Sequence, residues 1–81
     1  MKETPHLRRD DYGIEIRNHK PRGWHGLTSE PMRETDKAVQ CEYYGWMLWL
    51  PKARCVRVDD QLYTPRENIE SAKEHESAER S

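Results

Sequence analysis

Residues 43–55, YYGWMLWLPKARC, hold the densest apolar run of an otherwise polar chain, with two Trp, two Leu and one Met at positions 46–50. Hydrophobic residues make up only 33% of the 81 residues, so this run must supply much of any core. Tyr44-Gly45 suits a two-residue hairpin loop, because Gly accepts the positive φ that the second loop position requires. The stretch therefore predicts a β-hairpin with strands at 38–43 and 46–50.

The hairpin loop also fixes which side chains face each other across the two strands. The predicted pairs on one face are Tyr43–Trp46, Cys41–Leu48 and Val39–Leu50. The predicted pairs on the opposite face are Glu42–Met47 and Gln40–Trp49. Strand 46–50 is thus apolar on both sides, which predicts a central strand covered above and below. Exposed side chains at Val39, Leu48 and Leu50 would contradict this register.

The flanking segments predict further short strands. The alternation in YGIEIR (12–17) indicates a half-buried strand with Ile14 and Ile16 on one side. Pro51 should end the apolar strand, ARCVRV (53–58) should form the next, and Asp59-Asp60 should turn the chain into QLYT (61–64). Residues 18–36 show no sustained period and are predicted to form a long connection, after a loose arm over about 1–11.

A C-terminal helix has the clearest start signal. Thr64-Pro65-Arg66-Glu67 matches a capping box with Pro at the first helical position. Its apolar face is only Ile69 and Ala72, which predicts about two packed turns and a frayed acidic tail over about 74–81. The predicted fold class is therefore α+β: a single domain, 1–81, with a small antiparallel sheet of about four strands and a C-terminal helix.

Charge is distributed unevenly along the chain, although its formal net charge is only −1. Residues 1–58 carry 11 Lys and Arg against 8 Asp and Glu, and residues 59–81 carry 3 against 7. This basic excess is too small to require a nucleic-acid partner. The chain shows no secretory or membrane-spanning apolar run, and Cys41 and Cys55 lack metal-ligand spacing. These features predict a cytoplasmic protein with buried thiols, no membrane contact, no metal and no other cofactor.

Two basic segments are candidates for binding phosphates or an acidic partner. The first, RNHKPRGWHG (17–26), combines three cations with an aromatic ring and contains no acid, as single-strand binders do. The second basic segment contains Lys52, Arg54 and Arg57 and follows the apolar strand. The candidate residues are Arg17, Lys20, Arg22, Trp24, Lys52, Arg54 and Arg57. The alternatives are a solvated turn in which Trp24 covers the edge of the core, and an outer strand whose cations prevent edge-to-edge aggregation.

Aromatic and acidic residues give a second group of candidates. Tyr44, Met47, Trp49 and Trp24 would form an interface patch if the small core leaves them outside. The acidic tail could imitate a polyanion, and the alternative is a solvated helix. Its residues are Glu67, Glu70, Glu74, Glu76 and Glu79.

No convergent catalytic set is predicted. The carboxylate pairs Asp10-Asp11 and Asp59-Asp60 flank strands, where turns favour Asp. His19 and His25 lie six residues apart in a loop rich in Pro and Gly, without an orienting carboxylate. No nucleophile elbow or phosphate loop is present. The sequence therefore favours a binding protein over an enzyme.

Residues 35 to about 73 resemble small proteins encoded by bacteriophages and prophages. The shared pieces are TDKAVQCEY (35–43), WLPKARCVRV (49–58) and TPRENIESAKEHE (64–76), and the sharpest motif is Trp-Leu-Pro-Lys at 49–52. The resemblance implies a phage accessory protein with a small β-rich fold and implies no reaction. Phage proteins of this size include anti-CRISPR inhibitors, which act by binding.

The leading expectation is thus a non-catalytic protein that docks onto a host protein or nucleoprotein complex, as a monomer or a homodimer, and inhibits a defence system such as CRISPR–Cas. The alternative is an accessory protein that binds single-stranded nucleic acid.

Overall fold

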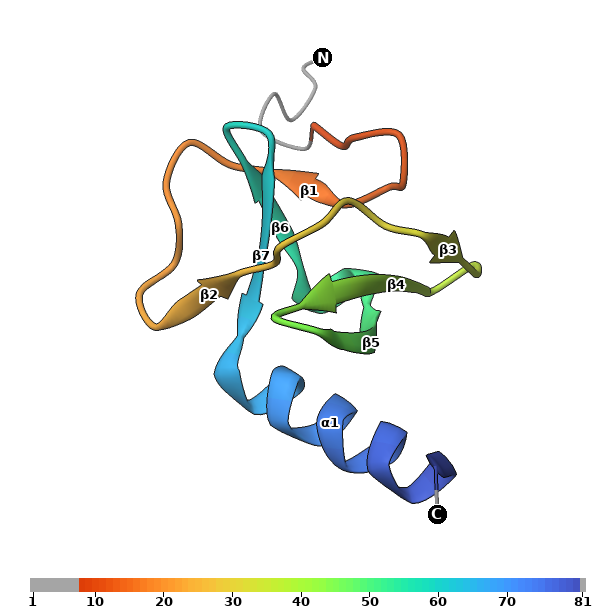
Figure 1. Cartoon of the computed structure of the whole chain (residues 1–81). Coiled ribbons are helices and arrows are strands. Elements are labelled where there is room, and N and C mark those ends of the chain that lie inside the picture. The colour runs from red at the N-terminus through yellow and green to blue at the C-terminus, as the bar shows by residue number, and fades with distance from the viewer. Residues whose placement is uncertain (1–7, 81) are drawn as a thin grey trace.

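The described part of the chain folds into two β-sheets followed by a C-terminal helix (Figure 1). The computed structural model describes residues 8–80, with side chains as far as Ala78. In the described residues, the first sheet has the strand order β1-β6-β7-β2 and the second β3-β4-β5. The elements are β1 Glu15–Ile16, β2 Trp24–Gly26, β3 Arg33–Glu34, β4 Ala38–Tyr43, β5 Trp46–Pro51, a 3-10 turn Lys52–Arg54, β6 Val56–Val58, β7 Gln61–Pro65 and α1 Arg66–Arg80. The predicted α+β class and the four-stranded sheet are confirmed.

Strands β4 and β5 form the predicted hairpin in the predicted register. The side chains that the register places inside are buried, with exposed fractions of 0% at Val39, Cys41, Leu48 and Leu50. The loop residues Tyr44 and Gly45 both have positive φ, 47° and 91°. Two positive φ values characterise the type I′ turn, whose twist matches that of the paired strands.

The prediction that residues 46–50 form a central strand is wrong. Strand β4 lies between β3 and β5, and β5 ends its sheet. Helix α1 lies against β5 (Figure 1) and contributes Ile69 to the core beneath the hairpin. On the outer face Met47 is half-buried, and Trp49 remains 37% exposed. One face of β5 therefore belongs to the core, while the other is covered only in part.

Residues 18–36 are not the open connection that the sequence predicted, because they include β2 and β3. Strand β2 pairs antiparallel with β7, and β3 pairs antiparallel with β4. Strand β1 forms at the predicted place but pairs in parallel with β6, so the first sheet is mixed rather than antiparallel. Strands of two or three residues are too short to show an alternating pattern of their own.

Aspartates build two of the turns, as predicted. Asp59 and Asp60 adopt positive φ values of 52° and 72° between β6 and β7. One carboxylate oxygen of Asp10 accepts the backbone N–H groups of Tyr12 at 2.9 Å and Ile14 at 2.8 Å. These bonds tie residues 10–14 into a turn, so the predicted loose arm does not extend this far. Residues 1–7 of that arm lie outside the described residues.

The chain between β5 and α1 departs from the prediction at three points. Strand β5 ends at Pro51 as predicted, but the next strand begins only at Val56. The predicted capping box is wrong, because Thr64 and Pro65 finish β7 and the Thr64 hydroxyl donates to the carbonyl of Arg54 at 3.1 Å. Helix α1 begins at Arg66 and continues to Arg80 instead of fraying beyond residue 73. Glu, Ala, Lys and Arg favour this extension through their helix propensity.

None of the helical segments within residues 8–80 combines the length and apolar character needed to cross a bilayer.

Candidate binding groove

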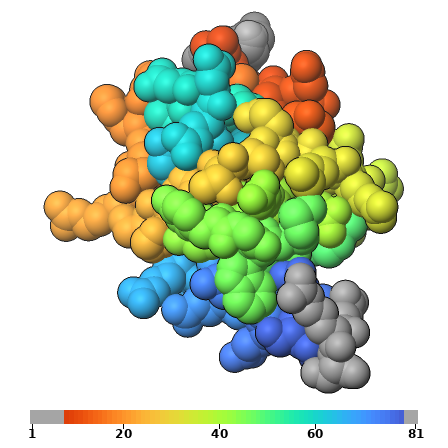
Figure 2. Space-filling view, in the orientation of Figure 1, coloured from red at the N-terminus to blue at the C-terminus, as the bar shows by residue number. Residues whose placement is uncertain are grey.

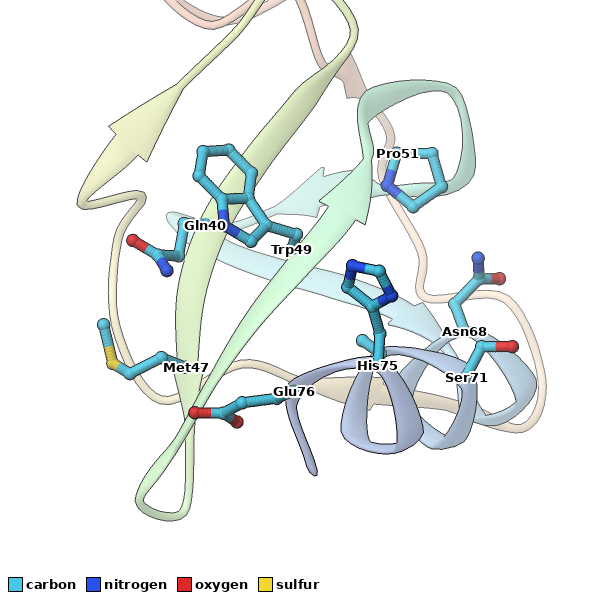
Figure 3. A pocket seen from close by; sticks show the side chains of 9 residues that line it. Gln40, Met47, Trp49, Pro51, Asn68, Ser71, His75 and Glu76 are labelled. Atoms are coloured by element: carbon cyan, nitrogen blue, oxygen red, sulfur yellow. The ribbon is translucent and has the colours of Figure 1, made fainter. Parts of the chain in front are cut away.

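A groove of about 540 Å³ lies between the outer face of the β4–β5 hairpin and helix α1 (Figure 3). Its strand wall consists of Gln40, Met47, Trp49 and Pro51, and its helix wall of Asn68, Ser71, Ala72, His75 and Glu76. Met47 and Trp49 were both predicted to belong to an interface patch. The structure therefore places two of the predicted binding residues in one concave site.

The hairpin register creates the strand wall. Leu48 and Leu50 point into the core, so the alternation of β5 turns Met47 and Trp49 to the outer face. Gln40 stands opposite Trp49 on the neighbouring strand. The outward position of the Trp49 ring thus follows from the burial of its two neighbours.

The spacing of residues along α1 creates the helix wall. Asn68, Ser71 and His75 recur at intervals of three and four, which places them on one helical face. Ile69 points instead into the core, where it is only 3% exposed, and fixes the rotation of the helix. Ser71 and Ala72 have short side chains, so the space in front of the strands stays open (Figure 3).

The groove combines apolar contact surface with hydrogen-bonding groups. Met47, Trp49, Pro51 and Ala72 supply the apolar part, and the remaining lining residues supply amide, hydroxyl, imidazole and carboxylate groups. Concave sites of this composition are typical of ligand and peptide binding. Among the residues that the structure describes, no group of three or more His, Cys, Asp or Glu side chains is placed to hold a metal ion.

Most of the predicted basic candidates are held in ion pairs instead of forming one basic surface. Lys20 donates to the carbonyl of Trp24, Trp24 is half-buried in β2, and Arg22 is exposed. The ion pairs are Arg17–Glu15 at 3.2 Å, Lys52–Glu34 at 2.7 Å and Arg54–Glu67 at 2.8 Å. The sequence could not show Glu34 and Glu67 as partners, because they lie 18 and 13 positions from Lys52 and Arg54.

Arg57 is held in an ion-pair network inside the fold. Its guanidinium donates to Asp10 at 2.8 Å and to both carboxylate oxygens of Glu30 at 2.8 and 3.1 Å. The Arg57 side chain is 14% exposed and that of Asp10 only 8%. Hydrogen bonding to Glu30, and then to Asp10, raises the pKa of the guanidinium above its ordinary value despite its burial. Arg57 thus joins the turn at residue 10, the segment at residue 30 and strand β6.

The predicted acidic tail does not form one polyanionic face in the described residues. Glu67 and Glu70 pair with Arg54 and Arg66. Glu74 is exposed, and Glu76 lies in the groove wall. The side chain of Glu79 lies outside the described residues.

Two other large apolar side chains are exposed in the described residues, and neither lines the groove. Tyr44 is 75% exposed at the hairpin loop. Its ring is edge-on to that of Tyr43, with 4.7 Å between the two ring centroids. Met32, which the sequence did not single out, is 55% exposed before β3. The groove residues that sequence reasoning missed are Gln40, Pro51, Asn68, Ser71, Ala72 and His75. The three-and-four spacing in α1 was the available signal for the helix wall.

Both cysteines are free and buried, as predicted. Burial, followed by the influence of Cys55 and Glu30, raises the pKa of the Cys41 thiol to about 12. Burial also raises the pKa of Cys55 to about 11, against a hydrogen bond with Thr64 that lowers it. The Cys55 thiol donates to the carbonyl of Pro51 at 3.3 Å. Both groups therefore behave as small apolar side chains of the core.

These thiols predict a loss of stability at alkaline pH. An exposed thiol in the unfolded chain ionises near pH 9.0, whereas the Cys55 and Cys41 thiols of the folded protein stay protonated up to about pH 11 and 12. The stabilising contribution is complete below pH 9 and is lost as pH rises through the folded pKa values. Each thiol should lower the free energy of unfolding by up to about 1.4 kcal/mol per pH unit in this range.

Urea unfolding at pH 8, 9, 10 and 11 would measure this loss, with Cys41→Ala and Cys55→Ala as variants. Each variant should show a smaller decrease with pH than the wild type, because one titrating thiol is removed. Equal slopes for the wild type and both variants would contradict the assignment.

The chain matches no protein-family model, no curated protein and no solved structure. The groove and its residues carry the case for function.

Proposed function

We propose that this chain is a non-catalytic binding protein that holds a segment of a partner protein in the groove between the β4–β5 hairpin and α1. The observation that carries this proposal is the position of Trp49. Trp49 is 37% exposed within this partly enclosed groove, where Met47 lines the same strand wall. Trp in such a position is the residue most often found to anchor protein interfaces.

The chemistry of the groove favours a segment with an apolar side chain next to a basic one. Met47, Trp49 and Ala72 offer the apolar contact, while Gln40 and Asn68 can exchange hydrogen bonds with an extended backbone. Among the described residues of the helix wall, Glu76 is an acid and none is Lys or Arg, so this wall is acidic. An acidic wall attracts a cationic partner and disfavours an acidic one.

The narrower proposal is that the partner is a host protein or nucleoprotein complex of a bacterial defence system, which the bound chain inhibits. Its support is the resemblance of residues 35–73 to small phage proteins, together with a groove suited to binding. An inhibitor that occupies a surface needs no reaction of its own. The proposal thus agrees with a groove that offers an exposed aromatic residue and other apolar contact surface.

Peptide selection tests the groove directly. A random peptide library would be selected on the immobilised wild-type protein, and enriched peptides measured by fluorescence anisotropy. We expect enriched sequences with an apolar residue next to Lys or Arg. Trp49→Ala should weaken their binding by about 30-fold or more, as hot-spot truncation does. Met32→Ala, which removes another exposed apolar side chain outside the groove lining, should change binding less than twofold.

Three outcomes would contradict the groove proposal: no enrichment, enrichment of acidic peptides, or equal binding by the wild type and Trp49→Ala. A concentration-dependent dimer that Trp49→Ala dissociates would also contradict it, since a second copy would then fill the groove. For the narrower proposal, the wild-type gene should restore phage plating on a host with active CRISPR–Cas, and Trp49→Ala should not. Unchanged plating with the wild-type gene would overturn the inhibitor proposal and leave the peptide result standing.

A further inference from the structure

A second hollow, of about 300 Å³, lies on a different face of α1 from the groove. Its lining is His25, Tyr43, Arg66, Ile69, Glu70 and Lys73. At 100° per residue, positions 66, 69, 70 and 73 share one side of the helix, and the groove-lining positions 68, 71, 72, 75 and 76 occupy the adjoining sides, with no residue in common. The two sites are therefore separate. The lining residues belong to strand β2, the end of β4 and the first turns of α1, whose arrangement Figure 1 shows.

The fold gathers three basic side chains here that the sequence separates widely. Strand β2 pairs with β7 and places His25 opposite Thr64, two residues before the helix begins. Arg66 opens the helix, and Lys73 follows two turns later on the same side. In the space-filling view the start of α1 (light blue) lies below β2 (orange) and beside the hairpin (green) (Figure 2).

Lys73 is held in place by aromatic rings. Its ammonium nitrogen lies 5.5 Å from the ring centroid of Tyr43 and 5.2 Å from that of Trp46. Contact with ring faces positions an ammonium group without neutralising its charge, as a carboxylate would. Lys73 is therefore a preorganised cation with N–H groups that can serve an anion.

The single acid of the hollow is a weak competitor for its cations. Arg66 pairs with Glu70 at 3.1 Å, but the two side chains are 75% and 61% exposed. Exposed helical pairs at this spacing contribute little and exchange readily. An anion that offers several oxygens can compete with Glu70 for the guanidinium, which binds phosphate through two parallel N–H donors.

We propose that this hollow binds a phosphate group, held by Arg66 and Lys73 as cations and by His25 as a hydrogen-bond donor. The phosphate belongs either to a free phosphate or phosphomonoester, or to a nucleic-acid backbone whose bases could stack on nearby aromatic rings. Neither Arg66 nor Lys73 lies in the two basic segments that the sequence indicated. This inference does not depend on the groove.

Nuclear magnetic resonance titration of the ¹⁵N-labelled full chain tests the site, with sodium phosphate as the probe and sodium chloride at matched ionic strength as the reference. We expect phosphate-specific shifts at the backbone amides of residues 25, 66 and 73. Lys73→Gln should weaken phosphate binding at least fivefold, and Lys73→Arg, which keeps the charge, should preserve it. Glu70→Gln should tighten binding at least twofold.

Glu74→Gln is the matched control, because it removes the same charge from an exposed position of the same helix outside the hollow. It should leave the affinity within about 1.3-fold of the wild type. If Lys73→Gln fails to fold, the phosphate affinities of Glu70→Gln and Glu74→Gln still test whether the hollow is the binding site. Trp49→Ala should not change phosphate binding, which keeps this test distinct from that of the groove.

An oligothymidylate arm distinguishes the sources of the phosphate. If oligothymidylate binds at least tenfold more tightly than inorganic phosphate, and Lys73→Gln weakens that binding, the phosphate belongs to a nucleic-acid backbone. Comparable affinity per phosphate would assign a free phosphate or monoester. The proposal is overturned if neither probe shifts these amides, if Lys73→Gln binds as the wild type does, or if Glu70→Gln and Glu74→Gln have equal effects.

Discussion

Replacing Arg57 with Met should lower the free energy of unfolding by about 3–5 kcal/mol, as expected when one partner of a buried ion pair is removed. The variant would leave the Asp10 carboxylate, whose side chain is only 8% exposed, without its cation. Glu30 adds less to the effect, because its side chain is 54% exposed and water can replace the guanidinium. Urea unfolding followed by Trp fluorescence would measure the change.

A second substitution should recover much of this loss. The Asp10→Asn, Arg57→Met double variant removes both charges of this buried pair, and replacing a buried ion pair by neutral groups is often close to neutral. Asn keeps an oxygen that can accept the N–H groups of Tyr12 and Ile14. Arg54→Met is the matched control, because its pair with Glu67 is largely exposed and should cost less than about 1 kcal/mol. Equal losses for Arg57→Met and Arg54→Met would contradict a structural role for Arg57.

The hairpin could be predicted from the sequence because its determinants are local. A two-residue loop and a period of two fix every pair from Val39 to Leu50, and the structure confirms them. The same locality explains the turn at Asp59-Asp60 and the end of β5 at Pro51. Each of these features depends on residues within a few positions of one another.

The division into two sheets could not be predicted because it depends on distant pairings. Glu15 pairs with Val56, and Trp24 pairs with Pro65, in strands of two and three residues. Segments this short carry no periodic signal. Their pairing partners depend on which strand edges the rest of the fold leaves without a neighbour. For the same reason the sequence presented Arg57 as a candidate binding residue, although Asp10 lies 47 positions away and neutralises it.

The groove was predictable in one wall only. Met47 and Trp49 were expected on the face of β5 opposite to Leu48, and they lie there. The sequence predicted that this face would be covered, with an interface patch as the alternative, and the structure leaves it partly open. The opposite wall depends on the continuation of α1 past residue 73 and on its rotation about the axis, which the burial of Ile69 fixes. The two apolar positions, Ile69 and Ala72, gave too little evidence that the helix continues. The other helical residues stabilise it through their helix propensity and through contact with the hairpin, and they do not form a wide apolar face.

Replacing Leu48 with Ala should have a comparably large effect, lowering the free energy of unfolding by about 2–5 kcal/mol. Leu48 has an exposed fraction of 0% and faces Cys41, which is equally buried. A domain of this length has a total stability of about 4–12 kcal/mol, so the loss would be a large part of it. The cost arises from the lost burial of the side chain and from the cavity that the surrounding core cannot fill.

Two comparisons locate this cost in the core face of β5. Leu48→Met keeps the volume and should cost less than about 1.5 kcal/mol. Met47→Ala truncates the neighbouring side chain on the outer, half-buried face and should cost less than Leu48→Ala, because solvent and the open groove already reach that position. Urea unfolding of the three variants would measure the order. If Met47→Ala destabilised the protein as much as Leu48→Ala, the outer face of β5 would be packed as tightly as the inner one, and the groove would not be open to a partner.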